Sequence, residues 1–448
     1  MTRRAVGGPE PVPEPVPEPV PVPDGRHEHA PVPWVRQPTH RAWLDEHCRS
    51  LLAFGSRCAV PGGGSAWLDD TGAPVPERGL HTWITARMVH VYSLGALLGV
   101  PGAGPVADAA LAGLTGPLRD TAHGGWFPSL DAEGRPAEGK ACYDHAFVVL
   151  ASASATAAER PGAARLLREA LTVFDERFWD ADEQLPVDTW DTAFSELDGY
   201  RGINAAMHTT EAMLAASDVL AHVLGDPAAA ATCRRRAVGI LDRVAAWARA
   251  NDWRVPEHFD ADWQVQLEHH ADRPDDPFKP YGATIGHGLE WARLLLHGEA
   301  ALVAAGEPAP PAMLSAAEAL FDRAVADGWD VDGAPGFVYT TDWTGRPVVR
   351  DRMHWVAAEA TATAAALHRR TGRRAYADRY ASWWDHIQRV LVDDEHGSWH
   401  HQLDEHNLPT DTVWPGKADL YHAVGATLVP RLPLAPALVV AVRQALWL

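Results

Sequence analysis

A twelve-residue pattern recurs between apolar helical segments, and it restricts the chain to repeat architectures. The three copies occupy residues 125–136, 336–347 and 398–409, each with Asp at position seven and Pro at position twelve. Aromatic arms flank a polar turn, which predicts a short β-hairpin. Looser relatives occur at 177–186 and 257–266. Hairpins that follow helix pairs at intervals of about 50 to 80 residues indicate five or six repeated units.

The segments between these hairpins have the composition and period of helices that pack on two sides. They are rich in Ala and Leu, and several are apolar nearly all round. We expect about ten to twelve helices and no run of alternating strands. The main ones cover residues 80–98, 141–158, 204–223, 228–249, 287–304, 311–326, 352–370, 374–392 and 418–430. Helical hairpins that hide both faces can close into a ring. The prediction is an all-α fold, an (α/α)6 barrel with short β-hairpins at one end, and an open helical solenoid is the alternative.

The N-terminal segment differs from the rest of the chain in composition. Residues 9–23 repeat Pro-Val-Pro-Glu, which favours extended polyproline II or disorder. We therefore predict a disordered Pro-rich tail at residues 1–32 and one folded domain at residues 33–448. The tail is either passive or a proline-rich docking ligand.

Charge and cysteine usage exclude several classes of partner. The net charge is −20, from 39 Lys and Arg against 59 Asp and Glu, which argues against nucleic acid or an anionic membrane. No apolar run approaches the ~20 residues of a membrane span, and no secretory signal is evident. Four cysteines without paired spacing fit a reducing compartment. We expect a cytoplasmic protein, and its oligomeric state is left open.

Polar clusters interrupt the apolar helices at points that a barrel would direct into its central pit. They are Arg87, Asp144 with His145, His208 with Glu211, His287 with Glu290 and Trp291, Arg352 with Trp355 and Glu359, and Lys417 with Tyr421 and His422. Each cluster alone can be a hydrogen-bonded structural group. Burying charge this often is costly unless function requires it, so together they predict an active site.

The residue types in these clusters favour proton transfer by histidine. Phosphate-binding glycine loops and a Gly-x-Ser-x-Gly elbow are absent from the sequence. The His-x-x-Glu pairs could bind a metal, but they reverse the Glu-x-x-His order of di-iron bundles and lack a third carboxylate at matching spacing, so a metal site is the minority interpretation. A glycosidase would need two free carboxylates, but Glu211, Glu290 and Glu359 each have a His or Arg nearby. Imidazoles suit proton transfer near neutral pH.

Seven blocks of the chain resemble the N-acylglucosamine 2-epimerase superfamily, and most closely its bacterial aldose–ketose isomerases for mannose or sulfoquinovose. In family order these blocks are HTWITARMVHVYSLG, GGWFPSLD, YDHAFVVLA, NAAMHTTEAMLAASDVL, KPYGATIGHGLEWARLLL, RMHWVAAEA and PGKADLYHA. The resemblance implies an (α/α)6 barrel, as the repeat does. Ile285 is a departure, because many relatives have Pro there, and the Pro-rich tail is not a family feature.

The resemblance also implies a reaction that needs no redox cofactor or metal. The sugar ring opens, a base removes the proton from C2, a cis-enediol or enediolate forms, and C1 receives the proton. Position in the matching blocks makes His287 and His422 the catalytic histidines. His422 is assigned the transfer between C2 and C1, and His287 is assigned ring opening and proton exchange with the sugar oxygens. Exchanged roles remain an alternative.

The remaining site residues are expected to bind and orient the sugar. Arg87 and His208 should donate to the developing enediolate, and Glu290 should fix the tautomer of a neighbouring imidazole. Three tryptophans could wall the pit, namely Trp355, Trp291 and Trp399. Lys279 with Arg87 could form a local cationic pocket.

From the resemblance we expect a neutral monosaccharide as the substrate, with mannose converted to fructose and lyxose to xylulose as a further reaction. A sulfoquinovose isomerase and a sugar 2-epimerase are the alternatives within the superfamily. More remote alternatives are an (α/α)6-barrel glycoside hydrolase, which would depend on carboxylate pairs, and a barrel that binds sugar without catalysis.

Overall fold

The computed structural model describes residues 32–448, within which Pro33–Leu448 form one compact unit. The tail predicted at residues 1–32 therefore falls, apart from Val32, outside the described residues. Among the described residues, no helix has both the length and the apolar character needed to cross a membrane.

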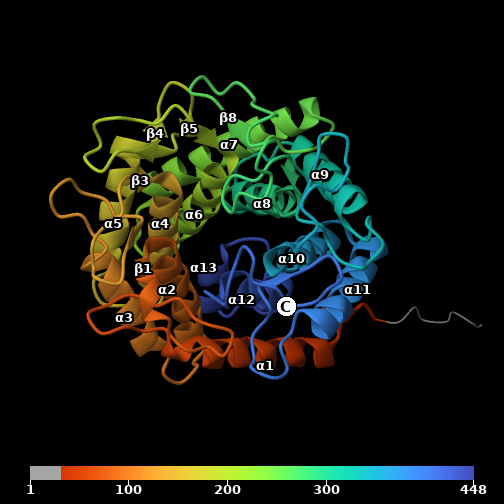
Figure 1. Cartoon of the computed structure of the whole chain (residues 1–448), viewed down its shortest axis with the longest axis horizontal. Coiled ribbons are helices and arrows are strands. Elements are labelled where there is room, and N and C mark those ends of the chain that lie inside the picture. The colour runs from red at the N-terminus through yellow and green to blue at the C-terminus, as the bar shows by residue number, and fades with distance from the viewer. Residues whose placement is uncertain (1–31) are drawn as a thin grey trace, which may run out of the picture. The chain divides into compact units, whose positions relative to one another are not determined.

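An inner ring of helices surrounds the centre of the described unit. Its members are α2 (Thr82–Leu97), α4 (Cys142–Ala157), α6 (Ile203–His222), α8 (Ile285–Ala304), α10 (His354–Thr371) and α12 (Tyr421–Leu428). Successive members contact each other, and α12 also contacts α2, so the ring is closed (Figure 1). This closure makes the open solenoid wrong. Helices such as α4 are buried at nearly every position because a second layer covers their outer face.

That second layer consists of amphipathic helices, one for each inner helix. Its members are α1 (Pro38–Phe54), α3 (Ala103–Thr115), α5 (Ala163–Val173), α7 (Pro227–Ala250), α9 (Ala312–Gly328) and α11 (Arg374–Val390). The outer helices α3, α5, α7, α9 and α11 each pack on the inner helix that precedes them in the chain. The outer helix α1 packs on α12. In α11, the buried residues Tyr376, Tyr380, Trp383 and Ile387 follow the helical spacing of a single apolar face. The architecture is the predicted (α/α)6 barrel.

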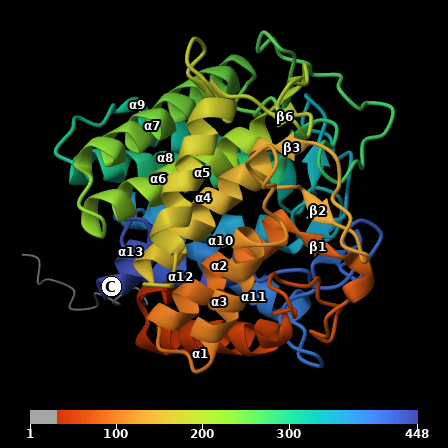
Figure 2. The same cartoon turned by 90° about the vertical axis from the view of Figure 1, so that its left-hand side faces the viewer.

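Short antiparallel strand pairs lie at one end of the barrel (Figure 2). The strands are β1 (Leu80–His81), β2 (Ser129–Leu130), β3 (Lys140–Ala141), β4 (Trp179–Asp180), β5 (Leu185–Pro186), β6 (Thr189–Trp190), β7 (Arg201–Gly202), β8 (His258–Phe259), β9 (Ala283–Thr284), β10 (Thr340–Thr341), β11 (Arg352–Met353) and β12 (Gln402–Leu403). The pairs are β1–β2, β3–β6, β4–β5, β7–β8, β9–β10 and β11–β12. In every pair but β4–β5, the strand before an inner helix pairs with the strand after its outer partner, so the repeat is strand, inner helix, outer helix, strand.

The predicted hairpins differ from this arrangement in their pairing. The turn is present, because Asp131 Oδ1 accepts the backbone N–H groups of Glu133 and Arg135 at 3.0 and 2.8 Å. Its arms, however, meet at a single bridge, Leu130 with Pro136, and the strand pairs instead with Leu80 and His81. Arms this short cannot form their own ladder, so the neighbouring strand satisfies them.

The strand end is also where most inner helices begin, because α2, α4, α6, α8 and α10 each start directly after a strand. The far end is filled by α13 (Leu438–Arg443), which contacts α2, α4 and α6 inside the ring (Figures 1 and 2). The barrel therefore opens toward the strand end, where the helix N-termini converge.

Two equivalent buried ion pairs fix the loops at this end. Lys140 Nζ donates to Asp120 Oδ2 at 2.8 Å and to the Gly124 carbonyl at 2.7 Å. Lys417 Nζ donates to Asp393 Oδ2 at 2.6 Å in the same way. Both lysines are fully buried. Lys417, which the sequence placed in a candidate site cluster, is therefore a loop anchor.

Replacing Lys140 by Met should lower the free energy of unfolding by about 3–5 kcal/mol, because it leaves a buried carboxylate unpaired. Burial favours the neutral form of Asp120, but the hydrogen bonds from Lys140, the backbone of Ala122 and His123 together outweigh it and lower the carboxyl pKa to about 2. The pair therefore stabilises the fold above the ordinary pKa of 3.8, and this stabilisation is lost as pH falls toward 2. Denaturant unfolding from pH 7 to pH 2 measures both effects, and equal stability of the Met variant at pH 7 would contradict them.

Candidate active site

A cavity lies at the strand end of the barrel, between the first turns of the inner helices. Its lining comprises Trp83, Arg87, Tyr143, Asn204, Met207, His208, Pro277, Phe278, Pro280, His287, Glu290, Tyr339, His354, Trp355, His401, Trp414, Ala418, Asp419 and His422. Arg87, His208, His287, Glu290, Trp355 and His422 were all predicted for the site, and the fold brings them together.

His287 lies on the first turn of α8, with a carboxylate behind it. Its Nδ1 is 2.8 Å from Oε2 of Glu257, and Glu257 Oε1 accepts the backbone N–H of Thr284 at 3.2 Å. The imidazole is 8% exposed and the carboxylate 4%, so the pair is largely shielded from solvent. A carboxylate on Nδ1 holds the proton there and leaves Nε2 as the nitrogen that can act on a ligand.

His422 lies on the first turn of α12 and has an analogous partner. Its Nδ1 is 3.2 Å from Oε1 of Glu359, whose Oε2 accepts from Nε of Arg293 at 2.7 Å. Burial lowers the pKa of His422 below its ordinary value, although the hydrogen bond to Glu359 acts in the opposite direction. The ring is therefore neutral near pH 7, as a general base requires.

Trp355 joins the two histidines into one site. Its ring centroid lies 5.4 Å from that of His287 and 5.7 Å from that of His422. Among residues 32–448, no hydrogen bond is made by Nε2 of either histidine. The two imidazoles thus line one cavity with their carboxylate partners on Nδ1.

Arg87 supplies a cation on the wall formed by α2. Its guanidinium donates to Asp419 Oδ2 at 3.1 Å and to the Tyr143 hydroxyl at 3.0 Å. It also lies 4.8 Å above the Tyr421 ring and 4.5 Å above the Phe147 ring. Burial alone would lower the pKa of Arg87, but Tyr143 and Asp419 raise it overall, so the group stays charged.

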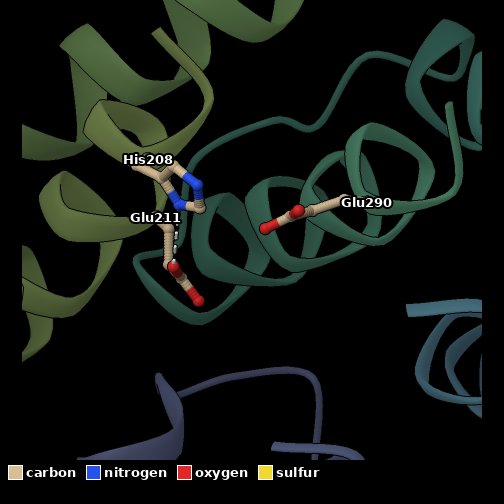
Figure 3. Close-up of side chains that lie close together, drawn as sticks. All are labelled: His208, Glu211 and Glu290. Carbon is tan, nitrogen blue, oxygen red and sulfur yellow. Dashed lines mark ion pairs between the residues drawn. The ribbon is translucent and has the colours of Figure 1, made fainter. Parts of the chain in front are cut away.

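Three further side chains, His208 and Glu211 on α6 and Glu290 on the neighbouring helix α8, point toward one another (Figure 3). One nitrogen or oxygen atom of each lies within 4.8 Å of the others, a spacing that could hold a metal ion. Both carboxylates of the trio already have partners, since the Tyr421 hydroxyl donates to Glu211 and Arg293 lies 3.4 Å from Glu290. The trio is therefore a weaker fit to a metal than its spacing suggests.

The protonation of this trio is unusual. Burial and repulsion from the Glu359 carboxylate raise the pKa of Glu290 well above its ordinary value. Burial lowers the pKa of His208 to about 4, so this imidazole is neutral. Glu290 Oε2 and His208 Nδ1 are both buried without a hydrogen-bond partner. A ligand hydroxyl in the cavity could satisfy such groups.

Several predicted roles need correction. Glu290 does not hold an imidazole; its partner is Arg293, and Glu257 and Glu359 orient the two histidines. Trp291 and Trp399 do not line the cavity. Both are fully buried, and Trp399 donates to His47 at 2.7 Å.

The other displaced residues lie on loops and strands. Lys279 lies in an adjoining cavity, with Nζ 3.7 Å above the Tyr200 ring. Arg352 is in β11 and pairs with Asp332 at 2.6 Å, so it does not share a helix face with Trp355.

Sequence reasoning missed Glu257, His354 and His401. The rings of His354 and His401 stack with centroids 3.9 Å apart, and the pKa of His401 is lowered by burial to about 4. A usable signal existed, because Glu257 and His401 both lie in the recurring turn segments 257–266 and 398–409. Apart from Trp399, the residues of those segments were considered only as parts of β-hairpins.

The geometry first defines a class of protein: a closed (α/α)6 barrel whose strand end holds two imidazole–carboxylate pairs and a buried guanidinium, an arrangement suited to proton transfer on a small polar ligand. The family model for N-acylglucosamine 2-epimerase (GlcNAc 2-epimerase) matches residues 63–426. The chain belongs to this family, which confirms the resemblance seen in the sequence.

Several individual members of the family are similar to this chain. The chain is 50% identical to a D-mannose isomerase of Thermobifida fusca over 408 residues, which is 90% of this chain and 97% of the relative. It is 45% identical to a D-mannose isomerase of Pseudomonas cannabina pv. alisalensis over 90% of this chain and 96% of the relative. A crystal structure of a D-mannose isomerase superposes with a TM-score of 0.79 at 25% identity, covering 87% of this chain and 97% of that one. The cellobiose 2-epimerase of Spirochaeta thermophila, at 22% identity and a TM-score of 0.73 over 88% and 97% of the two chains, shares the fold.

Proposed function

We propose that this chain is an aldose–ketose isomerase that interconverts D-mannose and D-fructose. The observation that carries the proposal is that a chain half identical to a D-mannose isomerase places two carboxylate-paired imidazoles in one cavity. D-Lyxose and D-xylulose, which present the same C1 and C2 groups, are a further substrate pair. As in the sequence prediction, the site of action is the cytoplasm.

The proton transfers follow from the two free Nε2 atoms. Ring opening moves the O1–H proton to a base, breaks the C1–O5 bond and returns a proton to O5, and His287 is placed to do this. His422 Nε2 then removes the C2 proton, whose bonding electrons form the C1=C2 bond while the C1=O1 π electrons move to O1, which gives a cis-enediolate. The O2–H proton passes to O1 by way of His287, the C2=O2 carbonyl forms, and the C1=C2 electrons take the proton held by His422 at C1, which gives the ketose. No oxidant or reductant is required.

The intermediate carries negative charge on oxygen, and the cavity is arranged to stabilise it. Arg87 remains charged and lines the wall. The N-termini of the inner helices α2, α4, α6, α8 and α10 face the strand end, so their partial positive charge adds to the same field. Both terms act on the enediolate more strongly than on the neutral sugar.

The charge of the cavity favours a neutral sugar over a sulfonated one. Among the described lining residues, Arg87 is the single Lys or Arg, and its charge is matched by Asp419. Lys279, which could have bound a sulfonate, lies over the Tyr200 ring in the adjoining cavity. An unpaired cation for an anionic substituent is thus lacking in this part of the structure.

Incubating the purified chain with D-mannose in D₂O, and following the mixture by NMR, tests the proposal. We expect D-fructose to accumulate, with deuterium at C1 to the extent that His422 exchanges its proton with solvent. Glucose as the main product would indicate a 2-epimerase. Unchanged mannose would contradict the proposal and leave a binding protein or hydrolase. A parallel sample with a chelator tests whether a metal at His208, Glu211 and Glu290 takes part.

A further inference from the structure

The two imidazole–carboxylate pairs of the cavity differ in charge. Glu359, the partner of His422, is also bound to Arg293 at 2.7 Å, so a cation balances its negative charge. Glu257 has His287 as its ion-pair partner, and no Lys or Arg in residues 32–448 pairs with it. A proton on His287 would therefore face an unbalanced carboxylate, whereas a proton on His422 would face a neutralised one.

Glu257 is held rigidly in this position. It precedes β8, and its backbone carbonyl accepts the N–H of Ile203 at 3.0 Å, at the start of α6. Its side chain accepts the N–H of Thr284, directly before α8, at 3.2 Å. The residue thus ties the first turns of two inner helices together and presents its second oxygen to His287. It does not itself line the sugar cavity.

We propose that Glu257 is the positioning residue of His287, and that its unbalanced charge makes His287 the imidazole that holds the O1 proton of the sugar during ring opening. This inference rests on the proposed isomerase function and deepens it. As C1–O5 breaks and C1=O1 forms, the O1–H proton passes to His287 Nε2, and the bonding pair of C1–O5 goes to O5. The imidazolium, held by Glu257 on Nδ1, then gives that proton to O5, so no net charge is created.

The other charged and titratable groups of the cavity do not take over this role. They are Arg87, Tyr143, His208, Glu290, Tyr339, His354, His401, Asp419 and His422. Glu290, one turn along α8 from His287, is the nearest carboxyl in sequence, but its partner is Arg293. Asp419 is paired with Arg87. Glu257 is thus the acidic group that contacts His287 directly.

The kinetic test uses Glu257→Gln, which keeps the side-chain length and a hydrogen-bond acceptor but removes the charge. We expect kcat for D-mannose to fall roughly ten- to a hundredfold, less than loss of the base itself would cost. KM should change little because Glu257 does not line the cavity. Glu299→Gln is the matched control: Glu299 is a buried carboxylate on the same helix, paired with Arg370 at 2.6 Å and outside the cavity lining, and its loss should leave kcat unchanged.

A second measurement needs no substrate. In ¹⁵N-histidine-labelled protein, the Nδ1–H proton of His287, identified by its loss in His287→Gln, should be strongly deshielded by the charge-assisted hydrogen bond. The signal should move upfield in Glu257→Gln and stay in place in Glu299→Gln. An unchanged signal or an unchanged kcat in Glu257→Gln would overturn the inference. If the signal behaves as expected but the parent chain leaves mannose unchanged, the proposed function fails while the pairing of Glu257 with His287 stands.

Discussion

The His422→Ala variant is expected to isomerise D-mannose roughly 10²- to 10⁴-fold more slowly than the parent chain. His422 is the imidazole that we assign to the carbon-bound proton, and Glu359 fixes its orientation through Nδ1 at 3.2 Å. Burial lowers the pKa of His422, so the ring stays neutral and active as pH falls to and below its ordinary value of 6.5. The decrease in kcat/KM that protonation of His422 causes on the acid side should therefore occur below pH 6.5. Initial rates of fructose formation between pH 5 and pH 8 measure both effects.

His386→Ala serves as the control for this variant. His386 is a buried histidine on the outer helix α11, 5.3 Å from the Trp329 ring, and it does not line the cavity. Its loss should change stability and leave kcat intact. A folded His422→Ala protein that keeps near-parental turnover would make the assignment of the base wrong. A loss confined to His287 variants would indicate that the roles of the two histidines are exchanged.

The Arg87→Gln variant should lose about 10²- to 10³-fold in kcat, the usual cost of removing a group that stabilises a developing oxyanion. Arg87 is the charged donor of the cavity wall, and the enediolate is the species that gains most from it. KM for mannose should change less than kcat, because the neutral sugar interacts weakly with the cation. Steady-state kinetics in both directions, mannose to fructose and back, should show the same loss.

This substitution also leaves Asp419 buried without its partner, so unfolding must be measured alongside activity. Arg87→Lys separates the two effects, because it keeps a cation beside Asp419 while losing the planar donor pair that also reaches Tyr143. We expect the Lys variant to fold like the parent and to have an intermediate kcat. If folded Arg87→Gln protein turns over at the parental rate, the stabilisation of the intermediate must come from the helix N-termini alone.

The barrel could be predicted from sequence because its signals are local and repeated. Segments such as 141–158 are apolar on all faces, and only a helix covered on both sides explains that pattern. The pairing of the strands could not be predicted in the same way. Leu130 pairs with Leu80, 50 positions earlier, and two-residue strands carry too little pattern to specify a distant partner.

The active site likewise contains residues that could be predicted from the sequence and residues that could not. Residues on inner-helix first turns, such as His287 and His422, were found because a polar group on an apolar helix is conspicuous. The orienting carboxylate was misassigned to Glu290, which is close to His287 in sequence, whereas the structure uses Glu257, 30 residues earlier. Trp291 follows His287 by four positions, yet it is fully buried and outside the lining. Sequence spacing gives neighbours along a helix but not contacts between a loop and a helix.

The packing of α1 on α12 determines when the barrel can close during synthesis of the enzyme. Five of the six helix pairs are contiguous in the chain, but the last joins residues near 45 to residues near 425. During translation the ring cannot close until α12 has left the ribosome, and Asp419 and His422 therefore become available only after the five contiguous helix pairs. A nascent or prematurely terminated chain would thus carry Arg87 and His287 yet be unable to turn over sugar, so activity arises only with the completed ring.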